Sequence, residues 1–412
     1  MPDVDIPWDV MDVFLSGNSA IDVPRLYTSS LHEAEEMLAS YGFHWLVESE
    51  RLEAGAIREE ALAFLLEELL HDEPELTISQ EVVDEEDVRK LLLWASADPL
   101  SPRQGERQRW SCALLRVMHT FVHCGSYFQQ VFSDQIRSQI LDRFDGHING
   151  EGKSLTLGAG PDAIPLVEFQ FRTSKSRRSL AMKLLMKAEN VGADIFDWVG
   201  LRFVTHERFD ALLVVKYLRR HNLTMFANVK PGRSRNTLLD PGTVKKHMAL
   251  VDDLIRSGKL AEHQRVSEIR RLVREEPFPH AAERSYNPFS ASSYHSIQFT
   301  CSQQVRVENP YLGSGVNRVL GAFDKTVPQA LRRRLKGGGV SRDVHFFFPY
   351  EVQIMDVEAF EASRSGRASH EVYKERQRYA VKKRLFGEHF AGKMLRRTQQ
   401  FRAIDLAPIT GS

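Results

Sequence analysis

The sequence predicts a mixed α/β protein in which a mixed sheet is flanked by helices and preceded by a separate all-helical domain. Two observations support this fold class. From about residue 30 to residue 150, apolar residues recur at i, i+3, i+4 and i+7, which is the spacing of amphipathic helices. After residue 165, short apolar runs typical of strands alternate with amphipathic helical segments, which indicates a sheet covered by helices.

The helical domain, expected over residues 1–150, is strongly acidic. Residues 1–100 contain 24 acidic and 5 basic residues, whereas the rest of the chain contains 31 acidic and 50 basic ones. A basic body is typical of proteins that bind polyanions such as nucleotides or RNA, and an acidic domain can cover such a surface. Two independent solvated faces would give the same asymmetry, so a regulatory role for this domain stays one of two alternatives.

A Gly-rich segment, DGHINGEGKSLTLGAGPDAIP, follows at 145–165, and we expect residues 151–164 to form a linker. Its GEGKS stretch partly matches the phosphate-binding P-loop motif GxxxxGK[ST]. The first glycine of that motif would fall on His147, and no buried strand leads into it. We therefore do not interpret the segment as a nucleotide-binding loop.

The second domain is expected over residues 165–390 and contains the predicted sheet. Strands are expected at 167–172, 200–206, 223–229, 294–307 and 345–357, and helices at 176–190, 207–221 and 366–386. A helical pair at about 240–285 is inserted between sheet elements, and residues 391–412 form a C-terminal tail.

Composition excludes several classes of protein. With 412 residues, of which 42% are hydrophobic and 27% charged, the chain can form two or three globular domains. It has no run of about 18 apolar residues and no basic region leading into an apolar leader, so we expect a cytoplasmic protein without a membrane partner. The three cysteines are too few and too scattered for a disulfide framework. His119, His123 and Cys124 in HTFVHC have the spacing of half a zinc site, but histidines in a helical core are more common.

Two carboxylates stand where predicted strands begin. Asp197 precedes VGLRFV, and Glu351 begins EVQIM. If the sheet brings these strands together, the two acids form a site for Mg²⁺, which prefers oxygen ligands and binds phosphates. The alternative is that each acid caps or pairs with its own neighbours.

Cations accompany these acids in the predicted loops. FRTSKSRRS supplies Arg172 and Lys175 together with Arg177 and Arg178, and PGRSRN supplies Arg233 and Arg235. Phosphoryl transfer requires cations around the transferred group, because negative charge spreads over its oxygens in the transition state. A solvated basic face is the alternative interpretation. An aromatic ring at a strand start, in SSYHSIQF, can stack on a nucleobase or pack in the core.

The order and spacing of these motifs resemble the synthetase domain of the RelA/SpoT family, over about residues 165–385. RTSKSRRSLAMKL resembles the family's ATP-binding stretch, DWVGLRF its D-L-x-A-I-R motif and PGRSRN its P-G-R-F-K-D motif. YHSIQ is similar to Y-Q-S-I-H, YEVQIMD to V-E-I-Q-I-R-T, and SGRASHEVYK to the closing G-x-A-A-H-x-x-Y-K. The resemblance implies a nucleotidyltransferase-like α/β (α+β) fold. It also implies Mg²⁺-dependent transfer of pyrophosphate from ATP to the 3′-hydroxyl of GDP or GTP, the alarmone synthesis of the stringent response.

The family's functional residues map onto matching positions of this chain. The resemblance assigns the metal to Asp197 and Glu351, with Glu351 also the catalytic base. The residues implied for ATP and phosphate binding are Arg172, Lys175, Ser179, Lys183, Arg233 and Arg235. The residues implied for acceptor binding are Tyr294, Gln298, Gln353, His370, Tyr373 and Lys374, of which Tyr294 would stack on guanine.

Departures from the family pattern leave the identity of the pyrophosphate acceptor undecided. Gln298 stands where the family has histidine, Met355 stands where it has arginine, and a long basic insertion separates PGRSRN from YHSIQ. Small toxic members of the family are thought to place pyrophosphate on the 3′ end of tRNA, and the basic residues between 215 and 345 are compatible with RNA. The alternatives are therefore GDP or GTP, tRNA, or a degenerate domain that binds nucleotide or RNA without turnover.

Overall fold

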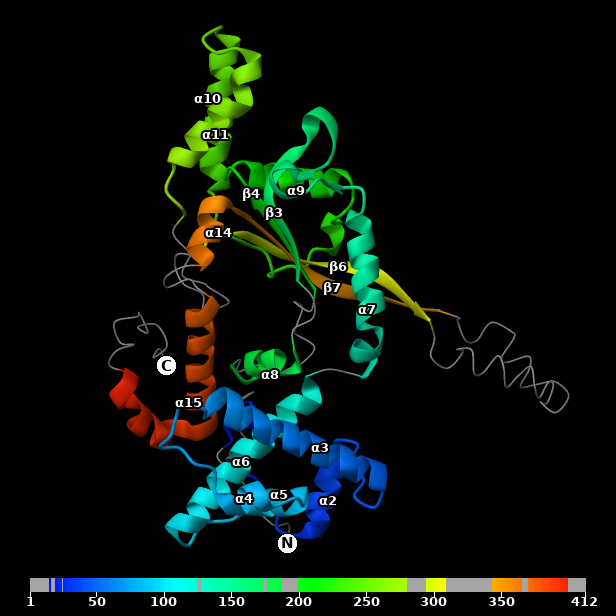
Figure 1. The fold of residues 1–412 in the computed structure, drawn as a ribbon, viewed down its shortest axis with the longest axis vertical. Coiled ribbons are helices and arrows are strands. Elements are labelled where there is room, and N and C mark those ends of the chain that lie inside the picture. The colour runs from blue at the N-terminus through cyan, green and yellow to red at the C-terminus, as the bar shows by residue number, and fades with distance from the viewer. Residues whose placement is uncertain are drawn as a thin grey trace, which may run out of the picture.

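The computed structural model describes residues 15, 19–23, 25–124, 127–172, 176–186, 199–279, 294–308, 343–364 and 370–398. In Figure 1 a group of helices lies at one end of the molecule and a sheet lies in the middle, so the fold is mixed α/β as predicted. At the other end, α10 (Pro241–Arg256) and α11 (Arg265–Glu275) project as an arm. No helix in the described ranges combines the length and the apolar character that crossing a membrane requires.

The N-terminal helices surround one hydrophobic cluster. They are η1 (Ala20–Asp22), α2 (Leu31–Ser40), α3 (Glu48–Phe64) with its continuation η2 (Leu65–Leu69), α4 (Gln80–Asp84), α5 (Val88–Ser96) and α6 (Pro102–His123). Ser30 and Ser101 cap α2 and α6 by accepting hydrogen bonds from the backbone N–H groups three residues on. The apolar stripes of these helices bury large side chains such as Phe64, Trp110 and Phe121.

Two helices from beyond residue 150 complete this N-terminal cluster. α8 (Arg177–Met186) contributes Leu184 and Leu185, and α15 (His370–Thr398) contributes Val381 and Leu385. Ion pairs between acidic N-terminal residues and these two helices surround the contact: Glu60–Arg177, Glu67–Arg178, Asp72–Lys382 and Asp22–Arg384. The expected domain boundary near residue 150 therefore does not separate the hydrophobic clusters.

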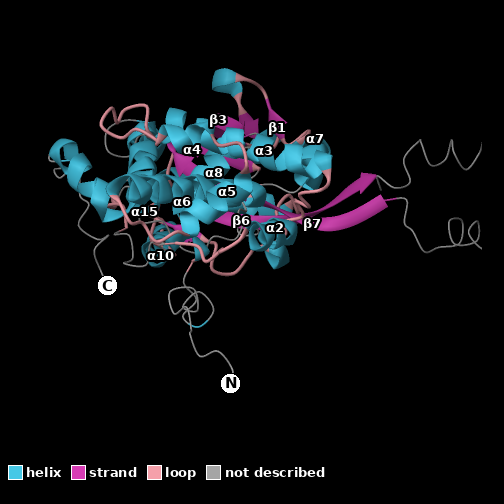
Figure 2. Cartoon of the chain, turned by 90° about the horizontal axis from the view of Figure 1, so that it is seen from below, coloured by secondary structure: helices cyan, strands magenta, loops and turns pink. Residues whose placement is uncertain are grey.

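Within the described residues, the sheet has seven strands in the order β1-β2-β3-β4-β7-β6-β5. The strands are β1 (Ile148–Asn149), β2 (Thr156–Leu157), β3 (Ile164–Arg172), β4 (Gly200–Thr205), β5 (Arg235–Asn236), β6 (Ile297–Glu308) and β7 (Asp343–Asp356). The β4–β7 pair is parallel and the other pairs are antiparallel, so the sheet is mixed as expected. β6 and β7 continue beyond β4 as a two-stranded ribbon (Figures 1 and 2).

The two faces of the sheet differ in chemistry because side chains alternate along each strand. One face carries the apolar residues of the strands, such as Phe203, Val352 and Ile354. α7 (Tyr127–Leu141), the turn η3 (Asp142–Phe144) and α9 (Asp210–Arg220) pack with this face. The other face carries polar residues in its centre. α14 (Val357–Arg364) reaches that face, since the ring of Phe360 lies 5.8 Å from the guanidinium of Arg202.

Two segments differ from the sequence prediction. The strand predicted at 223–229 is wrong, because the N–H groups of Leu223 and Thr224 bond to Leu218 O at the end of α9 and a 3-10 turn, η7 (Phe226–Asn228), follows. The expected Gly-rich linker contains β2 and the turns η4 (Gly152–Ser154) and η5 (Gly160–Asp162). Its Gly158 has φ +86°, and an added Cβ would lie 2.7 Å from the ring of Tyr217.

The arm formed by α10, η8 (Glu262–Gln264) and α11 confirms the predicted helical insertion. Its own small hydrophobic cluster contains Val251, Ile269 and Val273. All five arginines of the arm have a carboxylate partner: Arg256–Asp253, Arg265–Asp252, Arg270–Asp210, Arg271–Glu268 and Arg274–Glu207. The arginines of the arm are thus largely neutralised within the protein.

Candidate functional site

A row of polar side chains crosses the face of the sheet that is not covered by α7 and α9. Neighbouring strands place its members directly opposite one another, so all of them point to the same face. We call this set the polar row; it consists of Gln170 on β3, Arg202 on β4, Gln353 on β7, Gln298 on β6 and Arg235 on β5. The sheet register therefore brings together three residues that the sequence predicts for the site, namely Arg235, Gln298 and Gln353.

Arg202 is the cation at the centre of the polar row. Its side chain is 7% exposed, and its Nε donates to Gln353 Oε1 at 2.7 Å while Nη1 donates to Gln170 Oε1 at 3.3 Å. Gln170 in turn donates to Glu168 Oε1 at 2.7 Å. Burial lowers the pKa of Arg202, and Tyr294 and the charge of Glu351 oppose this, although no carboxylate among the described residues forms an ion pair with it. A buried guanidinium held by neutral amides retains positive charge that an incoming anion can neutralise.

A second row, two residues along each strand, contains the predicted carboxylate. We call it the carboxylate row; it consists of Arg172, Gly200, Glu351 and Thr300 on β3, β4, β7 and β6. Glu351 is half-buried, and the amide of Gln298 donates to its Oε1. Its backbone N–H donates to Val199 O at 2.9 Å, just before β4 begins. Gly200 contributes no side chain between Arg172 and Glu351, and an added Cβ there would be 3.6 Å from Arg172 Cβ.

Tyr294 lies beside both rows, three residues before β6 begins. Burial raises the pKa of its hydroxyl, and the positive charges of Arg202 and Arg172 oppose this rise, whereas the charge of Glu351 adds to it. Its carbonyl accepts a hydrogen bond from Thr237 Oγ1 at 3.2 Å, which ties it to the segment that follows β5. The phenol, two arginines and one carboxylate therefore influence one another electrostatically at this end of the sheet.

Other predicted residues lie elsewhere or outside the description. Ser179 and Lys183 lie on α8, which packs into the N-terminal cluster, and Ser179 Oγ bonds to Ser176 Oγ at 3.0 Å. Tyr373 and Lys374 lie near the start of α15, where Gln377 donates to the Tyr373 hydroxyl at 2.9 Å. His370 begins that helix, and Arg233 is exposed in the turn before β5. Asp197 and Lys175 lie outside the described residues.

A metal site is not complete within the described part of the chain. The described residues contain no group of three His, Cys, Asp or Glu side chains able to hold a metal ion. This includes the HTFVHC segment, where the rings of His119 and His123 lie 4.5 Å apart and Cys124 is buried. Glu351 is the predicted metal ligand that the structure describes, and pairing with Asp197 stays a prediction.

The sequence analysis missed the central residues Arg202 and Gln170. Both had a visible signal. Arg202 interrupts the apolar strand GLRFVT, where an uncompensated cation is costly, and it belongs to the DWVGLRF motif. In VEFQFR, Glu168, Gln170 and Arg172 alternate with apolar residues, which places three polar side chains on one face of a strand.

The polar row and the carboxylate row together form a surface that can bind an anionic ligand beside one carboxylate. Comparison with models of known protein families gives no match, and comparison with curated proteins gives none either.

Proposed function

We propose that the protein is an ATP-dependent pyrophosphotransferase of RelA/SpoT type that transfers pyrophosphate from ATP to the 3′-hydroxyl of GDP or GTP. The observation that carries this proposal is the buried Arg202, which forms no ion pair with a described residue and lies two positions along the sheet from Glu351. Phosphates need such a cation, and an attacking hydroxyl needs a base next to it. Four residues expected from the motifs, Arg172, Tyr294, Glu351 and Gln353, lie around it.

In the proposed reaction the acceptor's 3′-oxygen bonds to the β-phosphorus of ATP, and the bond from that phosphorus to the bridging oxygen breaks, releasing AMP. Glu351 accepts the proton of the attacking hydroxyl. Arg202 and Arg172 stabilise the negative charge on the transferred phosphates, and Tyr294 orients the acceptor guanine. Each role uses a side chain on the polar face or at its edge.

Mg²⁺ would be held by Glu351 and, as the sequence resemblance implies, by Asp197. Mg²⁺ commonly binds proteins through one or two carboxylates and takes its remaining ligands from phosphates and water, so this donor set suits it. When bound, it would neutralise phosphate charge. Glu351 has one oxygen occupied by the Gln298 amide, so the metal would compete with or displace that hydrogen bond.

The direct test is incubation of the full chain with γ-labelled ATP, Mg²⁺ and either GDP, GTP or tRNA. We expect label in GDP or GTP, because both γ- and β-phosphates are transferred. A reaction without acceptor and a Glu351→Gln variant serve as controls. The proposal fails if no acceptor is labelled although the protein binds a non-hydrolysable ATP analogue with Mg²⁺.

A degenerate nucleotide-binding domain is a second candidate, and one observation favours it. The Gln298 amide donates a hydrogen bond to a carboxylate oxygen of Glu351. Met355, which is buried in the apolar core, stands where the family has an arginine. Calorimetry separates the alternatives. A binder without turnover would retain affinity for ATP after Glu351→Gln and would give no labelled product with any acceptor.

Transfer to tRNA is a third candidate, and the C-terminal end of α9 would serve it better than the arm. Lys216, Arg219 and Arg220 line a hollow there beside Phe226, whose side chain is 73% exposed. None of these three cations has an ion pair within the described residues. Cations beside an exposed ring suit a single RNA strand. Replacing all three cations by Gln should then reduce labelling of tRNA and leave labelling of GDP unchanged.

A further inference from the structure

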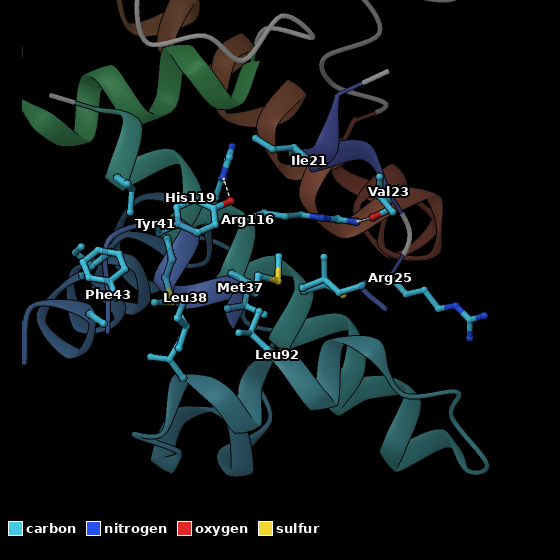
Figure 3. Close-up of a pocket in the computed structure, with 18 residues that line it drawn as sticks. Ile21, Val23, Arg25, Met37, Leu38, Tyr41, Phe43, Leu92, Arg116 and His119 are labelled. Atoms are coloured by element: carbon cyan, nitrogen blue, oxygen red, sulfur yellow. Dashed lines mark hydrogen bonds between the residues drawn. The ribbon is translucent and has the colours of Figure 1, made fainter. Parts of the chain in front are cut away.

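The N-terminal helices line a partly open, apolar cavity of about 130 Å³. It lies between α2, α3, α5, α6 and the segment around η1, within the N-terminal cluster (Figure 3). Its wall includes Leu38, Phe43, Ile57, Leu92 and Met118. Protein interiors contain few voids larger than a water molecule, and an apolar cavity of roughly 150 Å³ is large enough to bind benzene.

One cationic side chain of the wall, Arg116, forms no ion pair with a described residue. Arg116 donates through Nη2 to Val23 O at 2.6 Å and through Nη1 to Leu385 O at 3.0 Å. Burial lowers the pKa of Arg116, and the charge of Asp22 opposes this only from a distance, since the carboxylate of Asp22 is bound by Arg384 at 2.6 Å. A guanidinium has five N–H donors, so Arg116 has further donors to offer after these two bonds.

The described part of the wall adds no negative charge. The described residues that line the cavity include no aspartate and no glutamate. Within the wall, the Tyr41 hydroxyl hydrogen-bonds to His119 Nδ1 at 2.8 Å. Burial lowers the pKa of His119 to about 4, so this ring is neutral at pH 7. The cavity therefore combines an apolar body with one buried positive charge at its wall.

We propose that this cavity binds a small monocarboxylate with an apolar body about the size of a benzene ring. The carboxylate would accept hydrogen bonds from Arg116, for which guanidinium geometry is well suited, and the body would fill the space between Leu38, Ile57 and Met118. Because Arg116 also bonds to Leu385 O on α15, an occupied cavity would change the hydrogen bonding of that helix. The site is separate from the polar row and does not depend on the function proposed above.

Benzoate and the neutral benzyl alcohol, which share the same ring, form a matched pair of probes for this proposal. Calorimetry with the full chain should give benzoate an affinity at least tenfold higher than that of benzyl alcohol. Arg116→Gln should reduce the affinity for benzoate at least tenfold and leave that for benzyl alcohol unchanged. Hydrogen exchange should change around Leu385 on addition of benzoate to the parent protein.

Two further variants serve as controls: one fills the cavity, and the other changes an arginine outside it. Ala54→Leu adds apolar volume to the cavity from α3 while keeping Arg116, and it should abolish binding of both probes. Arg107→Gln, on the same helix as Arg116 but paired with Glu81, should bind both probes like the parent. Equal affinities of the parent for the two probes, no binding at millimolar concentration, or benzoate binding that survives Arg116→Gln in a folded protein would overturn the proposal.

Discussion

Two buried arginines near the two ends of β4 show how differently the fold uses the same side chain. Arg208, 5% exposed, lies 3.7 Å from Asp356 Oδ2 and 3.3 Å from Glu358 Oε2, and its guanidinium stacks 3.7 Å from the ring of Phe278. Arg202, 7% exposed, is held by two glutamine oxygens and forms no ion pair with any described residue.

We expect this difference to separate a structural cation from a ligand-binding one. The charge of Arg208 is compensated by two carboxylates, so its removal would leave the buried Asp356 without its ion-pair partner. Tyr294 and Glu351 favour the charged form of Arg202 without an ion pair, so its charge is compensated only in part until a ligand supplies a counter-charge. Four predictions test this distinction, and each concerns one of these two arginines or its neighbouring acid.

The largest expected effect is the loss of reaction rate on replacing Glu351, the acid beside Arg202. Glu351→Gln should reduce pyrophosphate transfer by about 10²- to 10⁴-fold, because it removes the base while keeping a similar shape. Rates of labelled product formation measure this. Glu308→Gln, an exposed position at the far end of β6, is the matched control and should keep the parent rate. A parent-like rate for Glu351→Gln would remove Glu351 from the reaction.

The next largest effect is expected on stability. Arg208→Met should lower the free energy of unfolding by about 3–5 kcal/mol, because it leaves the buried Asp356 without its partner. Urea denaturation measures this loss. Arg306→Met, which removes an exposed arginine of β6 paired with Asp343, should stay within about 0.5 kcal/mol of the parent. A similarly small change for Arg208→Met would contradict the structural role.

Arg202→Met should reduce ligand affinity and keep stability, the opposite of what we expect for Arg208→Met. We expect a free energy of unfolding at least equal to the parent's, because a buried charge without an ion-pair partner among the described residues is replaced by an apolar chain. Affinity for a non-hydrolysable ATP analogue should fall by about 1.5–3 kcal/mol, the contribution of hydrogen bonds to a charged group. Calorimetry and urea denaturation on the same sample measure both quantities. A large loss of stability with unchanged affinity for the ATP analogue would contradict the binding role of Arg202.

The smallest effect is the pH dependence of the Arg208 variant. Burial raises the pKa of Asp356, and Arg208 opposes this rise. A carboxyl group whose pKa is raised on folding contributes stability that is complete below its unfolded pKa and is lost as the pH rises through its folded pKa. Arg208→Met raises the pKa of Asp356 further, so its loss of stability should be smaller at pH 5 than at pH 8. A loss independent of pH would show that Asp356 is not the group left unpaired.

Much of the fold could be predicted from periodicity, and the site only in part. Strands β3, β4, β6 and β7 lie where apolar alternation indicates them, and the arm lies where helical spacing indicates it. Local pattern could not reveal that α8 and α15 pack on the N-terminal helices, because that choice depends on contacts between residues more than 100 apart in the chain, such as Glu60 with Arg177 and Asp72 with Lys382. It also could not reveal the polar row, because row membership depends on the register between strands distant in the chain.

The same long-range packing limits how deletions can be used. The sequence suggests removal of residues 1–150 as a test of regulation by the acidic domain. In the structure that deletion would expose Leu184 and Val381, which are buried against the N-terminal helices. Loss of activity after such a deletion would therefore report misfolding as well as regulation. Charge reversal at Glu60 or Glu67, which pair with arginines of α8, tests the contact without removing the core.

The position of α15 has a consequence for synthesis of the chain on the ribosome. The N-terminal helices emerge first, yet their cluster includes Val381, Leu385 and Phe386. Until these residues leave the exit tunnel, apolar surface on α6 stays open to solvent or to chaperones. Vectorial translation therefore cannot complete the N-terminal cluster before residues 381–386 have been synthesised.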